Sequence, residues 1–152
     1  MDLKDRHILI AVDESENAKR AVLYVSDFIG GFPGFRVTLL NIIPEPPEDY
    51  FKTTEERHGW IESHRHKTEQ MLENYRQILI QSGFSEGKVS VKLNIKDCPS
   101  VAECILDELK ELKACTVVIG RRGISKKEEF LFGSTSSKII HYAKNCSVWV
   151  IE

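Results

Sequence analysis

The chain alternates between short apolar runs and segments with helical periodicity, and this alternation restricts its fold more than any other feature. The runs of β-branched and aliphatic residues, each bounded by turn residues, lie at 7–12, 34–43, 88–95, 115–120 and 147–151. Apolar residues recur on one helical face in the segments between them, at 18–29, 68–79, 102–109 and 136–143. Nearly continuous apolar runs are typical of strands covered on both faces, and right-handed crossovers join such strands into parallel sheets. The pattern therefore predicts an α/β fold, a five-stranded parallel sheet with helices on both faces.

Length and charge restrict the function. At 152 residues the chain has the size of one domain, and we expect residues 1–152 to form it. Its 21 basic and 23 acidic side chains leave a net charge of −2, so no basic field attracts nucleic acid or an anionic membrane. The apolar run near the N-terminus is too short for a signal peptide or a membrane span. We expect a cytoplasmic protein that binds neither nucleic acid nor membrane.

The cysteines carry no recognisable redox or metal motif. Cys98, Cys104, Cys115 and Cys146 include no C-x-x-C pair and fall inside apolar or helical stretches. This placement favours reduced, buried thiols over disulfides or a zinc site.

The segments just after each strand are where a ligand is expected, because parallel α/β sheets bind ligands beyond the carboxyl ends of their strands. Three of these segments are short, 13–15, 41–47 and 97–100. The fourth is GRRGISKKEEFLFGSTSSK, from Gly120 to Lys138, which combines three glycines, five cationic side chains and a hydroxyl-rich stretch. It is the strongest candidate for a binding site.

Glycines and hydroxyls in this fourth segment have two interpretations. Gly120 and Gly123, at the end of the fourth strand, let a ribose or phosphate approach the main chain closely. Gly133, Ser134 and Thr135 then begin a helix, whose N-terminal amides and dipole favour an anion. The segment is therefore either a phosphate cradle or an ordinary loop followed by a helix cap.

Other known motifs fit less well. The sequence around Gly87-Lys88 has the wrong glycine spacing for a P-loop and continues with valine, and no G-x-G-x-x-G follows the first strand. A receiver domain would use the acidic pair Asp13-Glu14, but the third strand ends without the required aspartate. His58, His64 and His66 are better explained by an exposed helix face than by a metal site, since residues two apart on a helix diverge.

The sequence resembles a known protein family. Gly120, Gly123, Gly133 and Ser134 fit G-x2-G-x9-G-[ST], which is similar to the nucleotide-binding pattern of the universal stress protein family. HILIAVDESENAKRAV, VTLLNIIPEP, SVAECILDELKELKACTVVIGRRG and HYAKNCSVWVIE extend the resemblance over nearly the whole chain. It implies a Rossmann-like domain of the adenine nucleotide alpha hydrolase type with strand order 3-2-1-4-5, and membership of the ATP-binding subgroup.

The resemblance also implies which residues hold the nucleotide. The Asp13 carboxylate would contact the adenosine part, and the main chain at Ile42 would read the adenine edge. The implied contacts along ribose and phosphates are Gly120, Arg122 and Gly123, and those at the phosphate tail are Gly133, Ser134 and Thr135. A divalent cation, Mg²⁺ or Mn²⁺, would arrive with the ATP, so no metal ligand or catalytic residue is assigned to the protein.

Two positions depart from the family pattern. Glu14 stands where the family commonly has glycine, and its charge could oppose a nearby polyphosphate. Ser147 replaces a common proline in the turn before the last strand.

Family resemblance further implies a homodimer through the C-terminal strand at Val148, Trp149 and Val150; the alternative is that Trp149 only packs beneath the last helix.

These observations lead to three functional hypotheses. The first is an ATP-binding regulatory or signalling protein of the stress response, with little or no ATPase activity of its own and a protein partner that the sequence does not identify. The second is a metal-dependent enzyme that hydrolyses ATP or transfers a group from it through Asp13 or Glu14. The third is an interaction module that binds no nucleotide.

Overall fold

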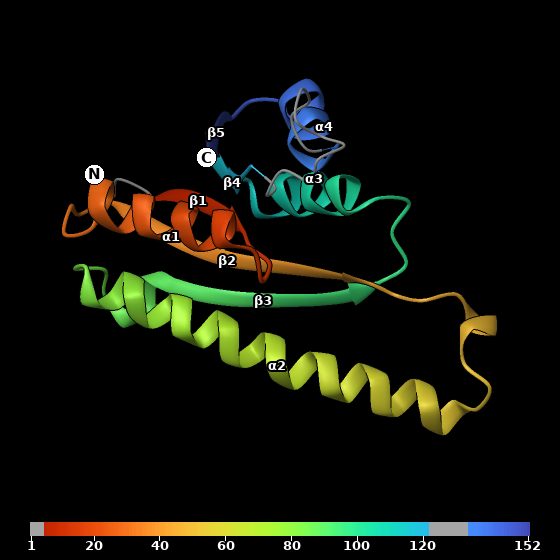
Figure 1. Ribbon diagram of the computed structural model, residues 1–152. Helices are drawn as coiled ribbons and strands as arrows, with labels where there is room; N and C mark the ends of the chain where they lie inside the picture. Colours follow the sequence, from red (N-terminus) through yellow and green to blue (C-terminus); the bar gives the residue numbers. More distant parts are fainter. Residues whose placement is uncertain (1–4, 122–133) are drawn as a thin grey trace.

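The computed structural model describes residues 5–121 and 134–152 (Figure 1). Its strands are β1 (Arg6–Ala11), β2 (Phe35–Pro44), β3 (Val89–Lys96), β4 (Thr116–Gly120) and β5 (Ser147–Ile151). Its α-helices are α1 (Glu16–Ile29), α2 (Thr54–Gln81), α3 (Val101–Leu112) and α4 (Ser134–Tyr142). Two short 3-10 helices, η1 (Glu48–Tyr50) and η2 (Glu86–Lys88), precede α2 and β3. The predicted alternation of strands and helices is confirmed.

All five strands pair in parallel in the order β3-β2-β1-β4-β5. β1 is the central strand, and its Ile10 lies between Leu39 of β2 and Val118 of β4. Both the fold class and the strand order therefore agree with the prediction. The carboxyl ends of β1, β2 and β4 meet at one edge of the sheet, which is where the chain changes its direction of winding.

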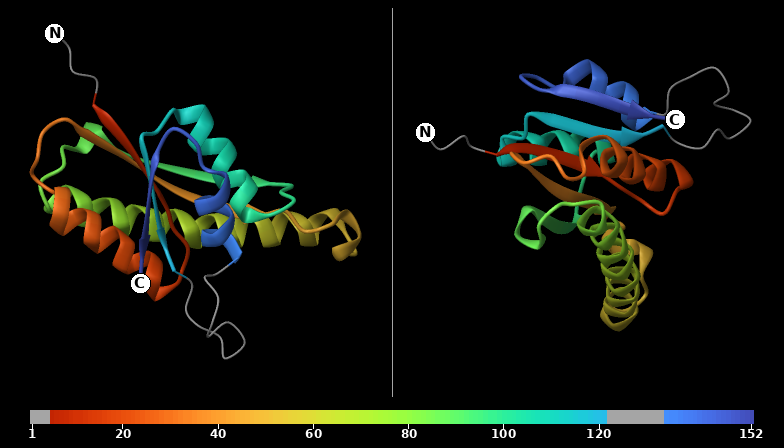
Figure 2. Two further views of the ribbon diagram at one scale, coloured as in Figure 1. Left: turned by 90° about the horizontal axis from the view of Figure 1, so that it is seen from above. Right: turned by 90° about the vertical axis from the view of Figure 1, so that its left-hand side faces the viewer.

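Two apolar layers enclose the sheet. Alternate residues of a strand point to opposite faces; Ile10 therefore packs with α1 and α2, whereas Leu9 packs with α3 and α4. Both side chains are fully buried. The two views of Figure 2 show α2 on one side of the sheet and α3 and α4 on the other. This arrangement explains the nearly continuous apolar runs of the central strands.

Polar caps fix where the helices begin. Ser15, Thr53 and Ser100 each accept a hydrogen bond from the main-chain N–H three residues later, at 3.2, 3.1 and 3.2 Å. For α2 and α3 the residue three positions on is a glutamate whose carboxylate also reaches back: Glu56 accepts from the Lys52 N–H, and Glu103 accepts from the Ser100 hydroxyl. These caps hold α1 and α3 in register with the strand ends that precede them.

Helix α2 is much longer than its apolar face at 68–79 indicates. Its N-terminal end extends past the end of β3, with η1 beside its start (Figure 1). There Phe51 packs against Trp60, and Arg57 forms an ion pair with Glu45, which ties the preceding connection to the helix. The residues His58, His64 and His66 lie exposed on this part of α2.

The expectation of four reduced cysteines is wrong. Cys98, in the connection after β3, forms a disulfide with Cys104 in α3, and their Cα atoms lie 6.0 Å apart. A pair only six residues apart can meet here because the chain reverses from strand into helix within that span. Cys115 and Cys146 are free, and burial, followed by the neighbouring Cys115, raises the pKa of the Cys146 thiol.

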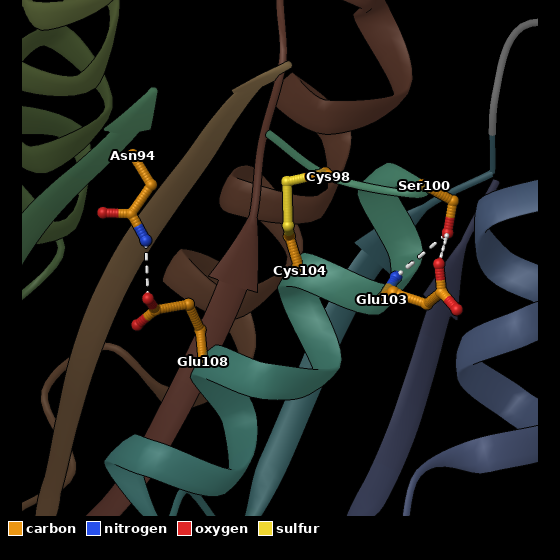
Figure 3. The surroundings of a disulfide bond; sticks show 6 residues. All are labelled: Asn94, Cys98, Ser100, Glu103, Cys104 and Glu108. Atoms are coloured by element: carbon orange, nitrogen blue, oxygen red, sulfur yellow. Dashed lines mark hydrogen bonds between the residues drawn. A yellow bond between two sulfur atoms is a disulfide. The ribbon is translucent and has the colours of Figure 1, made fainter. Parts of the chain in front are cut away.

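A buried ion pair joins α3 to the edge strand β3. The Glu108 side chain is 4% exposed, and it accepts hydrogen bonds from Lys92 Nζ at 2.7 Å and from Asn94 Nδ2 at 2.5 Å. Figure 3 shows the hydrogen bond between Asn94 and Glu108, about one turn along α3 from the disulfide. The Glu108 carboxylate can be buried because both of its oxygens accept hydrogen bonds.

Trp149 does not pack beneath the last helix, so that alternative is wrong. It lies on the α1 face of β5, where its ring makes edge-to-face contacts with Phe28 and Tyr24 at 5.9 and 6.3 Å between ring centres. Phe28 and Tyr24 are themselves 59% and 44% exposed. Together these three residues form an aromatic patch along the β5 edge of the sheet.

None of the helices in the described ranges combines the length and the apolar character that a bilayer crossing requires.

Candidate functional site

A hollow of about 190 Å³ opens at the carboxyl ends of β1, β2 and β4. Its walls come from the ends of these strands, from the starts of α1 and α3, and from Thr135 near the start of α4. Of the predicted site residues, Asp13, Ile42, Gly120 and Thr135 line it. Four residues separated widely in the sequence are therefore brought together where the topology predicts a ligand.

Asp13 closes the turn between β1 and α1. Its Oδ1 accepts a hydrogen bond from the Ser15 N–H at 2.8 Å, and Ser15 in turn caps α1. The Asp13 carbonyl accepts from the Tyr75 hydroxyl of α2 at 3.4 Å. The Ser15 N–H thus orients the carboxylate, Tyr75 holds the main chain of the turn, and the carboxylate presents hydrogen-bond acceptors to the hollow.

Asn41 interrupts the pairing of β1 with β2. The Val12 N–H donates to the Leu40 carbonyl at 2.8 Å, but the Val12 carbonyl accepts from the Asn41 side-chain amide at 2.7 Å. The main-chain N–H and C=O of residues two apart in a strand point towards the same neighbouring strand. Since Leu40 faces β1, the N–H and C=O of Ile42 face the β1 side as well. No main-chain hydrogen bond joins Ile42 to residues 5–121 or 134–152 on that side. A donor and an acceptor of Ile42 are left for a ligand.

The Asn41 side chain itself has an unused acceptor. The residue is 8% exposed and lines the hollow, and its Oδ1 has no hydrogen-bond partner among the described residues. A buried acceptor without a partner is costly, and such atoms occur mainly where a ligand or water completes them.

Gly120 is required by the packing of α1. A Cβ at this position would lie 2.5 Å from the carbonyl carbon and oxygen of Asn17 and 2.8 Å from the Ala18 nitrogen. The end of β4 therefore touches the first turn of α1 directly. The sequence interpretation gave Gly120 a role in ligand approach; the structure adds that no side chain fits between β4 and α1.

The start of α4 supplies the hydroxyl-rich end of the site. Thr135 is half-buried and lines the hollow, while Ser134 is exposed at the first position of the helix. The other three predicted residues, Arg122, Gly123 and Gly133, lie outside the described residues.

Acidic groups gather on the side of the hollow where β1 ends. Burial raises the pKa of Tyr75, and the charges of Asp13, Glu16 and Glu14 raise it further. Glu14 is exposed and does not line the hollow. Within the described part of the chain, no three His, Cys, Asp or Glu side chains are arranged to hold a metal ion. This side of the hollow suits hydroxyl or amino groups, whereas the helix terminus at α4 suits an anion.

A larger hollow, of about 470 Å³, lies between the C-terminal ends of α3 and α4. Its charged lining is mainly Lys110, Lys113 and Lys144. Lysines are favoured at helix C-termini because they complement the carbonyl end of the dipole. This hollow lies away from the carboxyl ends of the strands, so the smaller hollow is the better candidate.

Sequence reasoning missed three residues of the site. Asn41 could have been noticed as a polar residue inside the buried run LLNII. Val101 and Ile105 of α3, which form the apolar wall of the hollow, look like ordinary core positions in the sequence. Only the fold brings them to the strand ends.

Comparisons with known proteins identify the relatives of this chain. The model of the universal stress protein family matches residues 5–152. Universal stress protein Sll1388 of Synechocystis sp. is 28% identical over 152 residues, which cover 95% of this chain and 96% of that protein.

Solved structures share the fold. UspA from Lactobacillus plantarum superimposes with a TM-score of 0.77 at 19% identity, over 98% of this chain and 99% of that one. A universal stress protein from Archaeoglobus fulgidus in complex with dAMP gives 0.62 at 19% identity, over 97% and 98% of the two chains. A universal stress protein in complex with cAMP gives 0.66 at 14% identity, over 97% and 96%.

Proposed function

The chain belongs to the universal stress protein family, and from this premise we propose that it binds an adenine nucleotide in the hollow at the carboxyl ends of β1, β2 and β4. The observation that carries the proposal is the unpaired main chain of Ile42, which lies in the same hollow as Asp13 and Gly120. The complexes of two family members with dAMP and cAMP support the choice of an adenine nucleotide.

The chemistry of the hollow supports one orientation of the nucleotide. The N–H and C=O of Ile42 match the donor and acceptor pattern of the adenine edge, and the Asp13 carboxylate accepts from ribose hydroxyls. Gly120 allows close approach, and Ser134 and Thr135 at the start of α4 receive the phosphates. The remaining proposed contacts are those of Arg122, Gly123 and Gly133.

We propose ATP, carried with Mg²⁺ or Mn²⁺, as the physiological nucleotide and regulation as its purpose. The metal neutralises phosphate charge when it arrives with the nucleotide. Asp13 is the carboxylate that lines the described part of the hollow, and it is already engaged by the Ser15 N–H, so it is poorly placed to act as a general base. A cytoplasmic stress-response protein that signals its nucleotide state to a protein partner fits these properties.

Asp13→Asn tests the site without removing the turn. Asparagine keeps an oxygen for the Ser15 N–H, but it loses the charge that strengthens a hydrogen bond from a ribose hydroxyl. We expect affinity for MgATP to fall about tenfold, with little change in the midpoint of thermal unfolding. Isothermal titration calorimetry of both proteins measures the difference.

Glu14→Gln is the matched control, because it removes a neighbouring charge that is exposed and outside the lining of the hollow. Its affinity for MgATP should equal that of the unmodified protein. If the Asp13→Asn variant and the unmodified protein bind MgATP with equal affinity, Asp13 does not contact the nucleotide. ATP turnover near 1 per second or above would favour the enzyme hypothesis instead.

We further propose that two copies of the chain pair through β5. The strand lies at the edge of the sheet beside the aromatic patch, and edge strands of this kind are normally covered. Hydrogen bonds from the Ser147 N–H to the Cys115 carbonyl and from the Arg121 N–H to the Ile151 carbonyl fix the direction of its main chain. The N–H groups of Val148 and Val150 therefore point outward, away from β4.

Val150→Pro is expected to convert the dimer to a monomer. Proline at this position removes an outward N–H that would bond the second copy, and it leaves the bonds to β4 in place. Val150→Thr keeps the N–H and is the control. Light scattering coupled to size-exclusion chromatography measures the mass of each; an unmodified protein that is already a monomer at high concentration would contradict pairing through β5.

A further inference from the structure

The disulfide lies against one wall of the hollow. Cys98 is in the connection after β3, and Cys104 is in the first turns of α3 (Figure 3). Val101 and Ile105, which flank Cys104 along α3, both line the hollow. Cys104 is 2% exposed and packs in the same apolar cluster as Ile105. The bond therefore joins the apolar wall of the proposed site to the edge strand of the sheet.

Helix α3 is held by other contacts as well. Its first turn is capped by Ser100, which accepts from the Glu103 N–H at 3.2 Å, and its middle is tied to β3 by the Glu108–Lys92 pair. The helix is thus expected to persist when the disulfide is opened.

The connection before the helix has no such support. No hydrogen bond or ion pair joins residues 97–99 to any other residue in the ranges 5–121 and 134–152. Within these ranges, the disulfide at Cys98 is the one directional tie that the connection makes. Opening it frees the connection that leads into Val101, while the fold stays intact.

The two sulfur atoms differ in accessibility. Cys98 is half-buried, whereas Cys104 is almost completely enclosed. An external thiolate therefore reaches Cys98, and Cys104 is the leaving group.

We propose that Cys98–Cys104 is an exchange site for a dithiol reductant, and that its opening loosens the Val101–Ile105 wall and weakens nucleotide binding. The effect on binding rests on the proposed function, whereas the exchange and the loosening do not. The partner is defined by its chemistry as a molecule with two neighbouring thiols.

The exchange is balanced as a two-electron reaction. One thiolate of the reductant attacks the Cys98 sulfur, the Cys98–Cys104 bond breaks, and Cys104 leaves as a thiolate that takes up a proton. The second thiol of the reductant then attacks the mixed disulfide and releases Cys98. The protein gains two electrons and two protons, and the reductant becomes a disulfide.

The experiment compares the protein oxidised with glutathione disulfide and reduced with dithiothreitol. Titration of thiols in denaturant should give two per chain when oxidised, from Cys115 and Cys146, and four when reduced. Calorimetry with MgATP should show affinity about fivefold lower in the reduced protein, the size of a modest coupling between two sites. Amide hydrogen exchange of residues 97–105 should be faster after reduction.

Two variants control the comparison. The Cys98→Ser variant should bind MgATP with the affinity of the reduced protein under both conditions. Cys115 is an exposed thiol at the other end of β4, so the Cys115→Ser variant should keep the full difference in affinity between the oxidised and reduced states. Four free thiols in the oxidised protein, or equal affinity and equal exchange in the two states, would overturn the inference. If neither state binds adenine nucleotides, the proposed function fails, and faster exchange on reduction alone then supports the exchange site.

Discussion

Gly120→Ala is expected to abolish nucleotide binding and to lower the free energy of unfolding by about 3 kcal/mol, the upper range for an overpacked core position. The reason is the direct contact between the end of β4 and the start of α1, where a Cβ would meet the Asn17 carbonyl carbon and oxygen at 2.5 Å. Those atoms belong to the backbone, so no side chain can rotate out of the way. Helix α1 has to move, and Asp13 and Ser15 at its start move with it.

Gly59→Ala is the matched control for this substitution. Gly59 lies in α2, and a Cβ there would meet no atom within 4 Å. Alanine in a helix is more favourable than glycine, so this variant should be equally or more stable and should bind nucleotide normally. Urea denaturation and calorimetry with MgATP, run on both variants, make the comparison. A Gly120→Ala protein with unchanged stability and affinity would show that β4 and α1 do not approach so closely.

Lys92→Met is expected to cost about 2 kcal/mol of unfolding free energy. Methionine keeps most of the apolar stem but leaves the Glu108 carboxylate, 4% exposed, with the Asn94 amide alone. Removing one partner of a buried ion pair is costly because the other charge stays out of water. Because Lys92 is partly exposed, water screens part of the interaction, and the expected loss of unfolding free energy is smaller than for a fully buried ion pair. Urea denaturation measures it directly.

The double variant Lys92→Met/Glu108→Leu separates the charge from the packing. With both charges gone, no ion is left buried, and most of the lost stability should return. Stability that falls further in the double variant would mean that Glu108 supports α3 through contacts other than the ion pair.

The alternation of strand and helix was enough to predict the architecture. The runs around Ile10, Leu39 and Val118 are nearly continuously apolar because both faces of the central strands are covered. Strand order came from the family resemblance, since five parallel strands can be arranged in several ways that periodicity does not distinguish. The apolar face of α2 is confined to its C-terminal half, because the N-terminal end of the helix extends beyond the sheet and carries no apolar stripe.

Prediction of the site was less complete. Asp13, Ile42, Gly120 and Thr135 line one hollow, because each lies near the end of a strand or the start of a helix at the same edge of the sheet. The disulfide was missed because the spacing of Cys98 and Cys104 matches no motif, and their proximity depends on how the chain turns from β3 into α3. The role of Asn41 was missed because it depends on a backbone carbonyl of another strand. Such pairings between distant segments leave no mark in the sequence around either residue.

The central position of β1 has a consequence for synthesis on the ribosome. Ile8 of β1 pairs with Thr116 of β4, which is on the order of 100 residues later in the chain and is synthesised about ten seconds later at ordinary elongation rates. During that interval β1, β2 and β3 can assemble, but one side of β1 has no partner strand. The gap closes only when β4 has emerged from the ribosome. The contact between Gly120 and α1, which completes the hollow, forms at the same time. The proposed nucleotide site is therefore incomplete on the nascent chain until β4 has been synthesised.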